Sequence, residues 1–200
     1  DILNDLDTCK IEIISLEFES IMHLKTQQRL KIFTEKVLEY KNSKIDKALI
    51  ELCSNNLNCP PGMIKHVIIT IIKRNLTMNT VSNNDLCNWL KILLENISNP
   101  GDTIDEDIVS NVLKKFQLDT LNDNTCLKDC KENIEIVSTL VWNVGVNLII
   151  SNNKKSATKW CKNSICFAKL VNEGLTSQLK SMWYSLLSNT GIEDSEIDEI

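Results

Sequence analysis

The side chains that could do chemistry in this sequence are eight cysteines and two histidines. Cys126 and Cys130 form a C-x3-C pair, but no second pair lies near them, and a zinc site needs four ligands at close spacing. Neither His23 nor His66 has a triad partner in its local sequence. The sequence also lacks a glycine-rich phosphate loop and a nucleophile elbow. We therefore expect a protein that is not an enzyme and binds no metal or cofactor.

Five of the other six cysteines fit a packing role. A free thiol inside an apolar helical pattern behaves as a small hydrophobic side chain. Five cysteines are placed in this way: Cys9, Cys53, Cys87, Cys161 and Cys166. We interpret them as the reduced thiols of an intracellular protein.

Composition narrows the class of protein further. A chain of 200 residues can bury a sizeable core as one large or two small domains. Three prolines and five glycines are too few for a β-sandwich, a barrel or a disordered linker. A net charge of −5 argues against a nucleic-acid surface, and neither a run of about 18 apolar residues nor a signal pattern is present. We expect no membrane partner, and the start at Asp1 indicates a fragment or processed form.

Residues 133–170 read as two helices joined by the polar turn at 151–153. Gly145 and Ala157 lie twelve residues apart, one in each helix, and small residues there allow two antiparallel helices to approach closely, as in a tetratricopeptide repeat. In the first helix an apolar stripe recurs at every fourth position and predicts the buried face. The stripe consists of Ile136, Leu140, Val144 and Leu148, and Val137, Val141 and Gly145 lie beside it to make one broad apolar face.

Trp142 and Asn143 are the candidate binding residues. The repeat alignment puts Trp142 one place beyond a packing position, turned towards the groove that such repeats use for binding. Tryptophan is a favoured anchor at interfaces, and Asn143 can hydrogen-bond a partner's backbone. Val146 and Ile149 are weaker candidates. The alternative is that Trp142 lies in a core or an inter-repeat interface, in which case the chain is a structural segment of another intracellular scaffold.

Helical periodicity predicts nine helices and an α-solenoid of antiparallel pairs, or a compact helical bundle if the pairs do not stack in line. The expected ranges are 3–24, 26–40, 43–54, 61–78, 83–97, 103–117, 133–150, 154–170 and 176–188. A strand is the alternative for 67–72. Ser43 with Asp46, and Ser82 with Asp85, are the expected N-caps of two helices. The solenoid would form one domain over 1–188, with its best repeat at 131–172 and a capping helix at 176–188.

Charged segments lie near the C-terminus. Residues 189–200 are expected to be a disordered acidic tail, in which Ser195 with Asp198 matches a weak phosphorylation pattern. Four lysines gather on the second helix of the pair and are interpreted as a solvated face, although they could meet an acidic partner or the tail. They are Lys154, Lys155, Lys159 and Lys162.

The order of these segments resembles the C-terminal part of the meiotic Spo-twenty-two/Zip-four family of tetratricopeptide-repeat scaffolds. The resemblance covers roughly residues 60–188 and is strongest over 132–187. The positions that match the family pattern are Glu132, Glu135, Trp142-Asn143, Gly145 and Trp160. Asn133, Ile134, Thr158 and Cys161 depart from it, which leaves the subfamily open.

The resemblance implies a non-catalytic scaffold in the nucleus, on meiotic chromosomes. Such a scaffold holds the crossover-promoting complex together and supports assembly of the synaptonemal complex. It implies that Trp142 and Asn143 dock a short segment of a central-element protein. Other members of the crossover-promoting complex would bind elsewhere on the full-length chain.

Overall fold

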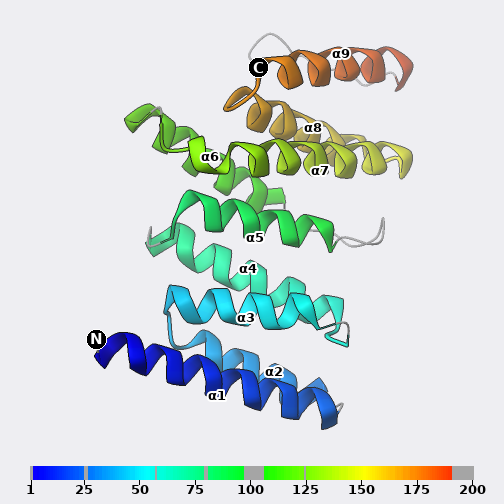
Figure 1. Ribbon diagram of the computed structural model, residues 1–200. Helices are drawn as coiled ribbons and strands as arrows, with labels where there is room; N and C mark the ends of the chain where they lie inside the picture. The colour runs from blue at the N-terminus through cyan, green and yellow to red at the C-terminus, as the bar shows by residue number, and fades with distance from the viewer. Residues whose placement is uncertain are drawn as a thin grey trace. The chain divides into compact units, whose positions relative to one another are not determined.

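The computed structural model describes residues 2–24, 27–56, 58–78, 81–96, 106–123 and 125–190, and every regular element in these ranges is helical (Figure 1). The chain divides into two compact units, Asp1–Val81 and Ser82–Ile200, which are described separately. The first unit contains α1 (Ile2–Leu24), α2 (Gln27–Leu38), α3 (Ser43–Asn55) and α4 (Pro61–Met78). The second contains α5 (Asn83–Glu95), α6 (Glu106–Asn122), the short 3-10 helix η1 (Lys128–Cys130), α7 (Lys131–Ile150), α8 (Lys154–Lys169) and α9 (Glu173–Thr190).

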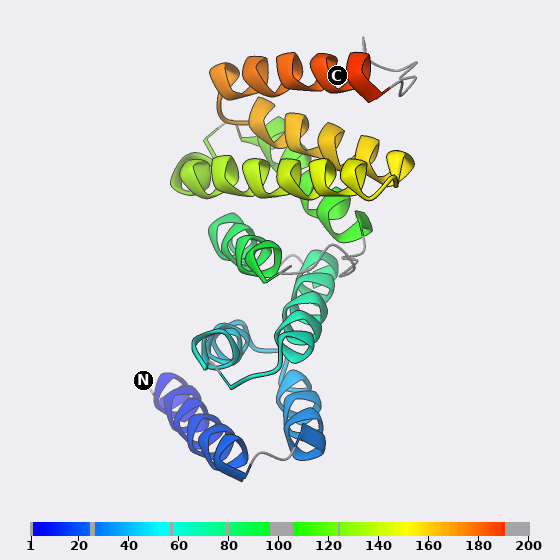
Figure 2. The same cartoon turned by 90° about the vertical axis from the view of Figure 1, so that its right-hand side faces the viewer.

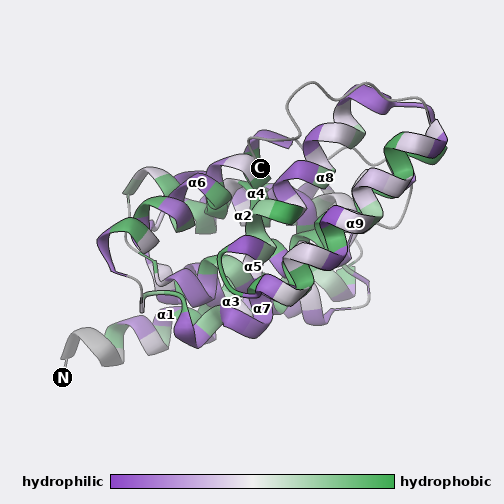
Figure 3. Cartoon of the chain, turned by 90° about the horizontal axis from the view of Figure 1, so that it is seen from above, coloured by the Kyte–Doolittle hydropathy of each residue, from purple (hydrophilic) through white to green (hydrophobic). Residues whose placement is uncertain are grey.

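These elements confirm the all-α fold class, and the strand alternative for 67–72 is wrong because those residues lie inside α4. Each helix carries both hydrophobic and hydrophilic residues along its length (Figure 3). Amphipathic helices of this kind bury one face against their neighbours. The tetratricopeptide-like detail and the single domain over 1–188 remain predictions.

Two helices, α6 and α9, have an end that differs from its predicted position by three residues or more. α6 continues to Asn122, past the predicted end at 117, and Lys115 Nζ lies 2.8 Å from Asp119 Oδ2 across one turn of this extension. Its predicted start at 103 lies outside the described residues. α9 begins at Glu173 because the side chain of Asn172 accepts a hydrogen bond from the Leu175 backbone N–H (3.1 Å) and caps the helix.

At its other end, α9 runs to Thr190, so residues 189 and 190 are helical rather than part of a tail. The rest of the predicted acidic tail, including Ser195, lies outside the described residues.

One of the two predicted N-caps is confirmed and the other is wrong. Ser82 accepts a hydrogen bond from the Asp85 backbone N–H (3.1 Å) at the start of α5, as expected. At the start of α3, however, the cap is Asn42 rather than Ser43. The Asn42 side chain accepts hydrogen bonds from the backbone N–H groups of Lys44 (2.9 Å) and Ile45 (3.3 Å). Asparagine is as good a cap as serine, so the sequence alone does not separate the two.

Asp46 is buried in the first unit instead of supporting a cap. Its carboxylate forms an ion pair with Arg74 of α4, and Asn75 Nδ2 lies 3.3 Å from its second oxygen. The Arg74 guanidinium also donates to the carbonyl oxygen of Leu38, the last residue of α2. One buried charge pair therefore links α2, α3 and α4.

In the second unit, α7 and α8 run antiparallel and lie side by side, with α9 beside α8 (Figures 1 and 2). A Cβ atom added at Gly145 would lie 2.6 Å from Cys161 Sγ and 3.3 Å from the carbonyl oxygen of Ala157. The hydroxyl of Ser138 donates to the Ser164 carbonyl (2.9 Å), and that of Ser164 donates to the Ser138 carbonyl (2.8 Å). The predicted close approach at Gly145 and Ala157 is confirmed.

The turn between the two helices also matches the prediction. Asn152 has a φ of 60°, in the left-handed region that asparagine tolerates better than most residues. Asn153 then caps α8 by accepting a hydrogen bond from the Ser156 backbone N–H.

Replacing Asp46 should strongly destabilise the first unit. We expect Asp46→Asn to lower the free energy of unfolding by about 3 kcal/mol, because it leaves the Arg74 guanidinium with a neutral partner in a buried site. Chemical denaturation measures this change. Glu35→Gln, which removes the exposed pair with Lys31, is the matched control and should change stability by less than about 0.5 kcal/mol. Equal effects of the two substitutions would contradict the buried link.

Gly145→Ala should lower the free energy of unfolding by about 1–3 kcal/mol, since the new methyl group overlaps Cys161 in a packed interface. Gly62 in α4 has no atom within 4 Å of an added Cβ. Gly62→Ala is therefore expected to be neutral, or to stabilise the chain by up to about 1 kcal/mol through helix propensity. Thermal melts of both variants check the comparison, and a neutral Gly145→Ala would show that the helices are less closely packed.

Candidate functional site

Trp142 lies in the core of the second unit and not in an open groove. It is only 4% exposed and packs in one cluster with side chains of α8 and α9. The other buried members are Cys161, Ile165, Ala168, Leu179 and Trp183. The expectation that Trp142 faces a groove is wrong because the repeat alignment considered only α7 and α8. The third helix, α9, covers the side of the pair on which the indole lies.

The buried face of α7 matches the predicted apolar face only in part, since Val137, Val141 and Gly145 are buried as expected but the stripe beside them is not. The residues of that face are Ile134, Val137, Ser138, Val141, Trp142 and Gly145. Ile136, Leu140, Val144 and Leu148 are only partly buried. The paired serines at 138 and 164 satisfy each other's hydrogen bonds inside the core, so a polar residue occupies a position that the apolar pattern alone assigns to the surface.

Of the four candidate residues, only Asn143 is exposed. It follows Trp142 and therefore points about 100° further around the helix. Val146 and Ile149 are half-buried and pack against the Trp142 cluster. They line the contact between α7 and its neighbours rather than a binding groove.

A hollow of about 480 Å³ lies between the first half of α7 and the start of α9. Its lining residues are Glu132, Glu135, Ile136, Thr139, Leu140, Asn172, Leu175 and Gln178. Asn143 follows Thr139 by four residues and Leu140 by three, so it lies one helical turn beyond the hollow on the same face of α7. We call this surface, the hollow plus Asn143, the α7–α9 face.

One side chain holds the two walls of the hollow together. Asn172 Nδ2 donates a hydrogen bond to Glu135 Oε1 (3.0 Å), while Asn172 Oδ1 accepts the capping bond of α9. The start of α9 is thereby fixed against α7. Sequence reasoning missed this surface, because residues 132–140 and 172–178 are brought together only by the packing of α9.

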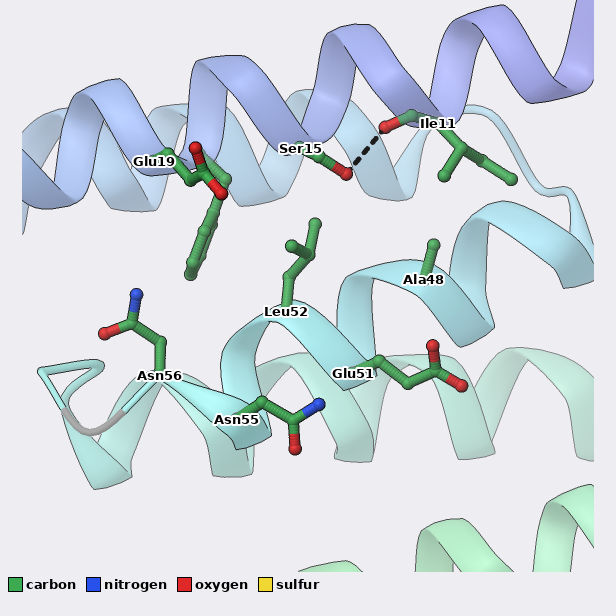
Figure 4. Close-up of a pocket in the computed structure, with 9 residues that line it drawn as sticks. Ile11, Ser15, Glu19, Ala48, Glu51, Leu52, Asn55 and Asn56 are labelled. Atoms are coloured by element: carbon green, nitrogen blue, oxygen red, sulfur yellow. Dashed lines mark hydrogen bonds between the residues drawn. The ribbon is translucent and has the colours of Figure 1, made fainter.

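A second hollow, of about 350 Å³, lies between α1 and α3 in the first unit (Figure 4). Glu19, Glu51 and Asn55 stand at its edge, and the Ser15 hydroxyl donates to the Ile11 carbonyl of its own helix (2.9 Å). None of the residues singled out from the sequence lies there.

The lysine cluster on α8 is partly engaged by the fold. Lys159 forms an ion pair with Glu106 of α6, and this partner raises the pKa of the Lys159 ammonium. Lys154 Nζ donates to the carbonyl oxygen of Thr190 at the end of α9 (2.8 Å). These contacts attach α8 to two neighbouring helices.

The described residues contain no group of three or more His, Cys, Asp or Glu side chains placed to hold a metal ion. Cys53, Cys87 and Cys161 are buried, as predicted, and burial raises the pKa of the Cys161 thiol to about 12. Cys166 is half-buried. Cys9 is exposed, so its predicted place in a core is wrong.

α7 is also apolar enough to be compared with a membrane-spanning helix, although its sequence has no unbroken run of about 18 apolar residues. By length and mean hydropathy (1.4), the segment Lys128–Ile150 could span a bilayer, with a third of its apolar window buried. A core helix of a soluble protein passes the same test. The packing of α7 against α5 and α8 accounts for its apolar composition in the same way.

Comparison with known proteins identifies the family. Over 194 residues, 97% of this chain, the sequence is 35% identical to Sporulation-specific protein 22 of Saccharomyces cerevisiae. The chain belongs to the Spo-twenty-two/Zip-four family. It spans about a fifth (20%) of the length of that relative. No protein-family model matches the sequence, and no solved structure matches it.

Family membership confirms the resemblance drawn from the sequence. Two of the residues on which that resemblance rested, Glu132 and Glu135, line the hollow, and Asn143 lies one turn away. The matching Trp142, Gly145 and Trp160 are instead buried. In this chain, the Trp142–Asn143 pair therefore contributes one side chain to the core and one to the surface.

Truncating Trp142 should unfold the second unit at lower denaturant concentration. We expect Trp142→Ala to lower the free energy of unfolding by about 3–5 kcal/mol, because it leaves a large cavity between α7, α8 and α9. Trp89→Ala, which removes another buried tryptophan (2% exposed) of the same unit, serves as a comparison and should cost a similar amount. A Trp142→Ala variant as stable as the wild type would place the indole outside the core.

Proposed function

We propose that this chain is a non-catalytic protein–protein interaction segment of a meiotic scaffold, in the nucleus and on chromosomes. It would link the crossover-promoting complex to assembly of the synaptonemal-complex central element by docking a short segment of a central-element protein. Support comes from the family, whose yeast relative is named as sporulation-specific. The all-helical fold, with neighbouring helices packed in antiparallel pairs, is also typical of scaffolds.

The observation that carries the proposal is the placement of Asn143. Its amide is exposed next to a hollow whose floor includes the half-buried side chains of Ile136, Leu140 and Leu175. Binding sites combine partly exposed apolar surface with a few polar groups that fix orientation. An exposed amide can pair with both a donor and an acceptor of a partner's backbone.

Trp142 then contributes to docking through the structure and not by direct contact. Its indole packs on α8 and α9, and this packing sets the position of both walls of the hollow. Loss of Trp142 would weaken partner binding only as far as it loosens α9. Asn143 is the residue that would touch the partner.

The burial of Trp142 also supports a second candidate, a structural segment of a helical scaffold with no binding role at this pair. The two candidates differ in what Asn143 does. In a structural segment Asn143 is only a solvated surface residue, whereas at a docking site its amide contacts the partner.

The experiment is a binding titration of the chain against the central-element protein of the same organism, comparing wild type with Asn143→Ala. We expect affinity to fall at least about tenfold, as at an interface residue that contributes substantially to binding. The free energy of unfolding should change by less than about 0.5 kcal/mol, because the side chain is exposed.

Asn88→Ala provides the matched control. Asn88 is also an exposed asparagine in the middle of a helix of this unit, and it too stands beside a buried tryptophan, Trp89. This variant should bind the partner like the wild type. Unchanged binding by Asn143→Ala, or an equal loss in both variants, would favour the purely structural role.

A further inference from the structure

The charge of the α7–α9 face suggests what kind of segment binds there. None of the eight residues that line the hollow, all of them described by the structure, is a lysine or arginine, while two are glutamates. Both glutamates belong to the first two turns of α7, so the negative charge is concentrated at one end of the face. The opposite end carries the neutral amide of Asn143.

Resting on the proposed function, we infer that the docked segment is a short amphipathic helix that places a lysine or arginine against Glu132 and Glu135. Its apolar side chains lie on Ile136, Leu140 and Leu175. Its far end reaches Asn143.

The size of the face sets the length of the segment. Glu132 and Asn143 are eleven positions apart on one helix, which is a rise of about 16 Å, or roughly three turns. A helix of about three turns can present apolar anchors at positions i, i+3 or i+4, and i+7 to such a surface. The half-buried Ile136 and Leu140 are spaced four apart, so one apolar row of the partner can pack along them.

The carboxylates of Glu132 and Glu135 are placed to favour a positively charged side chain of the partner. Glu135 is held by the hydrogen bond from Asn172 Nδ2 to one of its oxygens (3.0 Å), so its position is fixed before a partner arrives. Glu132 is exposed one turn closer to the start of α7. Lys131 adjoins Glu132 in the sequence but projects about 100° away around the helix, outside the lining of the hollow.

Other ligand classes fit this surface poorly. An acidic peptide, a nucleic-acid backbone or an anionic lipid headgroup would bring negative charge against two carboxylates. Like charges brought together at an interface oppose binding and give specificity against the wrong partner. The same carboxylates attract a basic residue, which adds orientation to the non-directional apolar contact.

The test uses the whole 200-residue chain and fluorescent peptides of about 15 residues, long enough for three turns, that overlap along the central-element protein. Fluorescence anisotropy measures their affinity at about 50 and 200 mM salt. We expect the bound peptide to be basic and amphipathic and to lose affinity severalfold at the higher salt. Glu132→Lys should weaken its binding about tenfold.

Glu17→Lys is the matched control, since Glu17 is an exposed glutamate in the middle of α1 and the substitution changes net charge equally. It should bind like the wild type. A second measurement exchanges the charges: a peptide whose basic residue is replaced by glutamate should bind Glu132→Lys more tightly than it binds the wild type. Circular dichroism verifies that each variant is folded.

The possible results separate this inference from the proposed function. If Asn143→Ala loses binding but Glu132→Lys does not, or if the bound peptide is acidic, the docking role stands and the basic partner is wrong. If no peptide binds the wild-type chain and the intact central-element protein does not bind either, both are wrong. If Glu132→Lys and Glu17→Lys weaken peptide binding equally, the effect comes from the net charge of the chain and not from the α7–α9 face. That result would overturn the inference.

Discussion

The packing of the Trp142 indole against α8 and α9 is the contact on which the second unit depends. It joins residues of α7, α8 and α9 in one buried cluster, to which Trp183 of α9 also belongs. Because α9 is held in this way, Asn172 at its start can reach Glu135 on α7 (3.0 Å). The hollow between the two helices is thus a consequence of the core beneath it.

Trp142 and Asn143 are adjacent in the chain, but one is buried and the other is exposed. Trp142 supplies apolar area to the interior, and Asn143 presents an amide to solvent on the neighbouring face. Neighbours on a helix point about 100° apart, so such a pair can couple the stability of a core to the geometry of a surface. Substitutions at the first residue act on folding, and substitutions at the second act on binding.

Local sequence features predicted the parts of the fold that depend on local physics. The close approach of α7 and α8 follows from Gly145 and Ala157, two small residues at the right separation, and the Ser82 cap follows from its own side chain. The burial of Trp142 could not be predicted in this way. It depends on Leu179 and Trp183, which are roughly forty residues further along the chain and belong to another helix. The predicted stripe on α7 was wrong for a related reason. A polar residue, Ser138, lies on the buried face, and its hydrogen bonds are made with Ser164 of another helix.

Hydrogen–deuterium exchange of the chain, with and without the central-element protein, tests most directly where the partner lies. The account predicts added protection in residues 132–143 of α7 and 172–178 of α9, with residues 157–168 of α8 unchanged because none of them lines the hollow. Protection confined to α1–α4, or spread evenly over the chain, would contradict docking on the α7–α9 face.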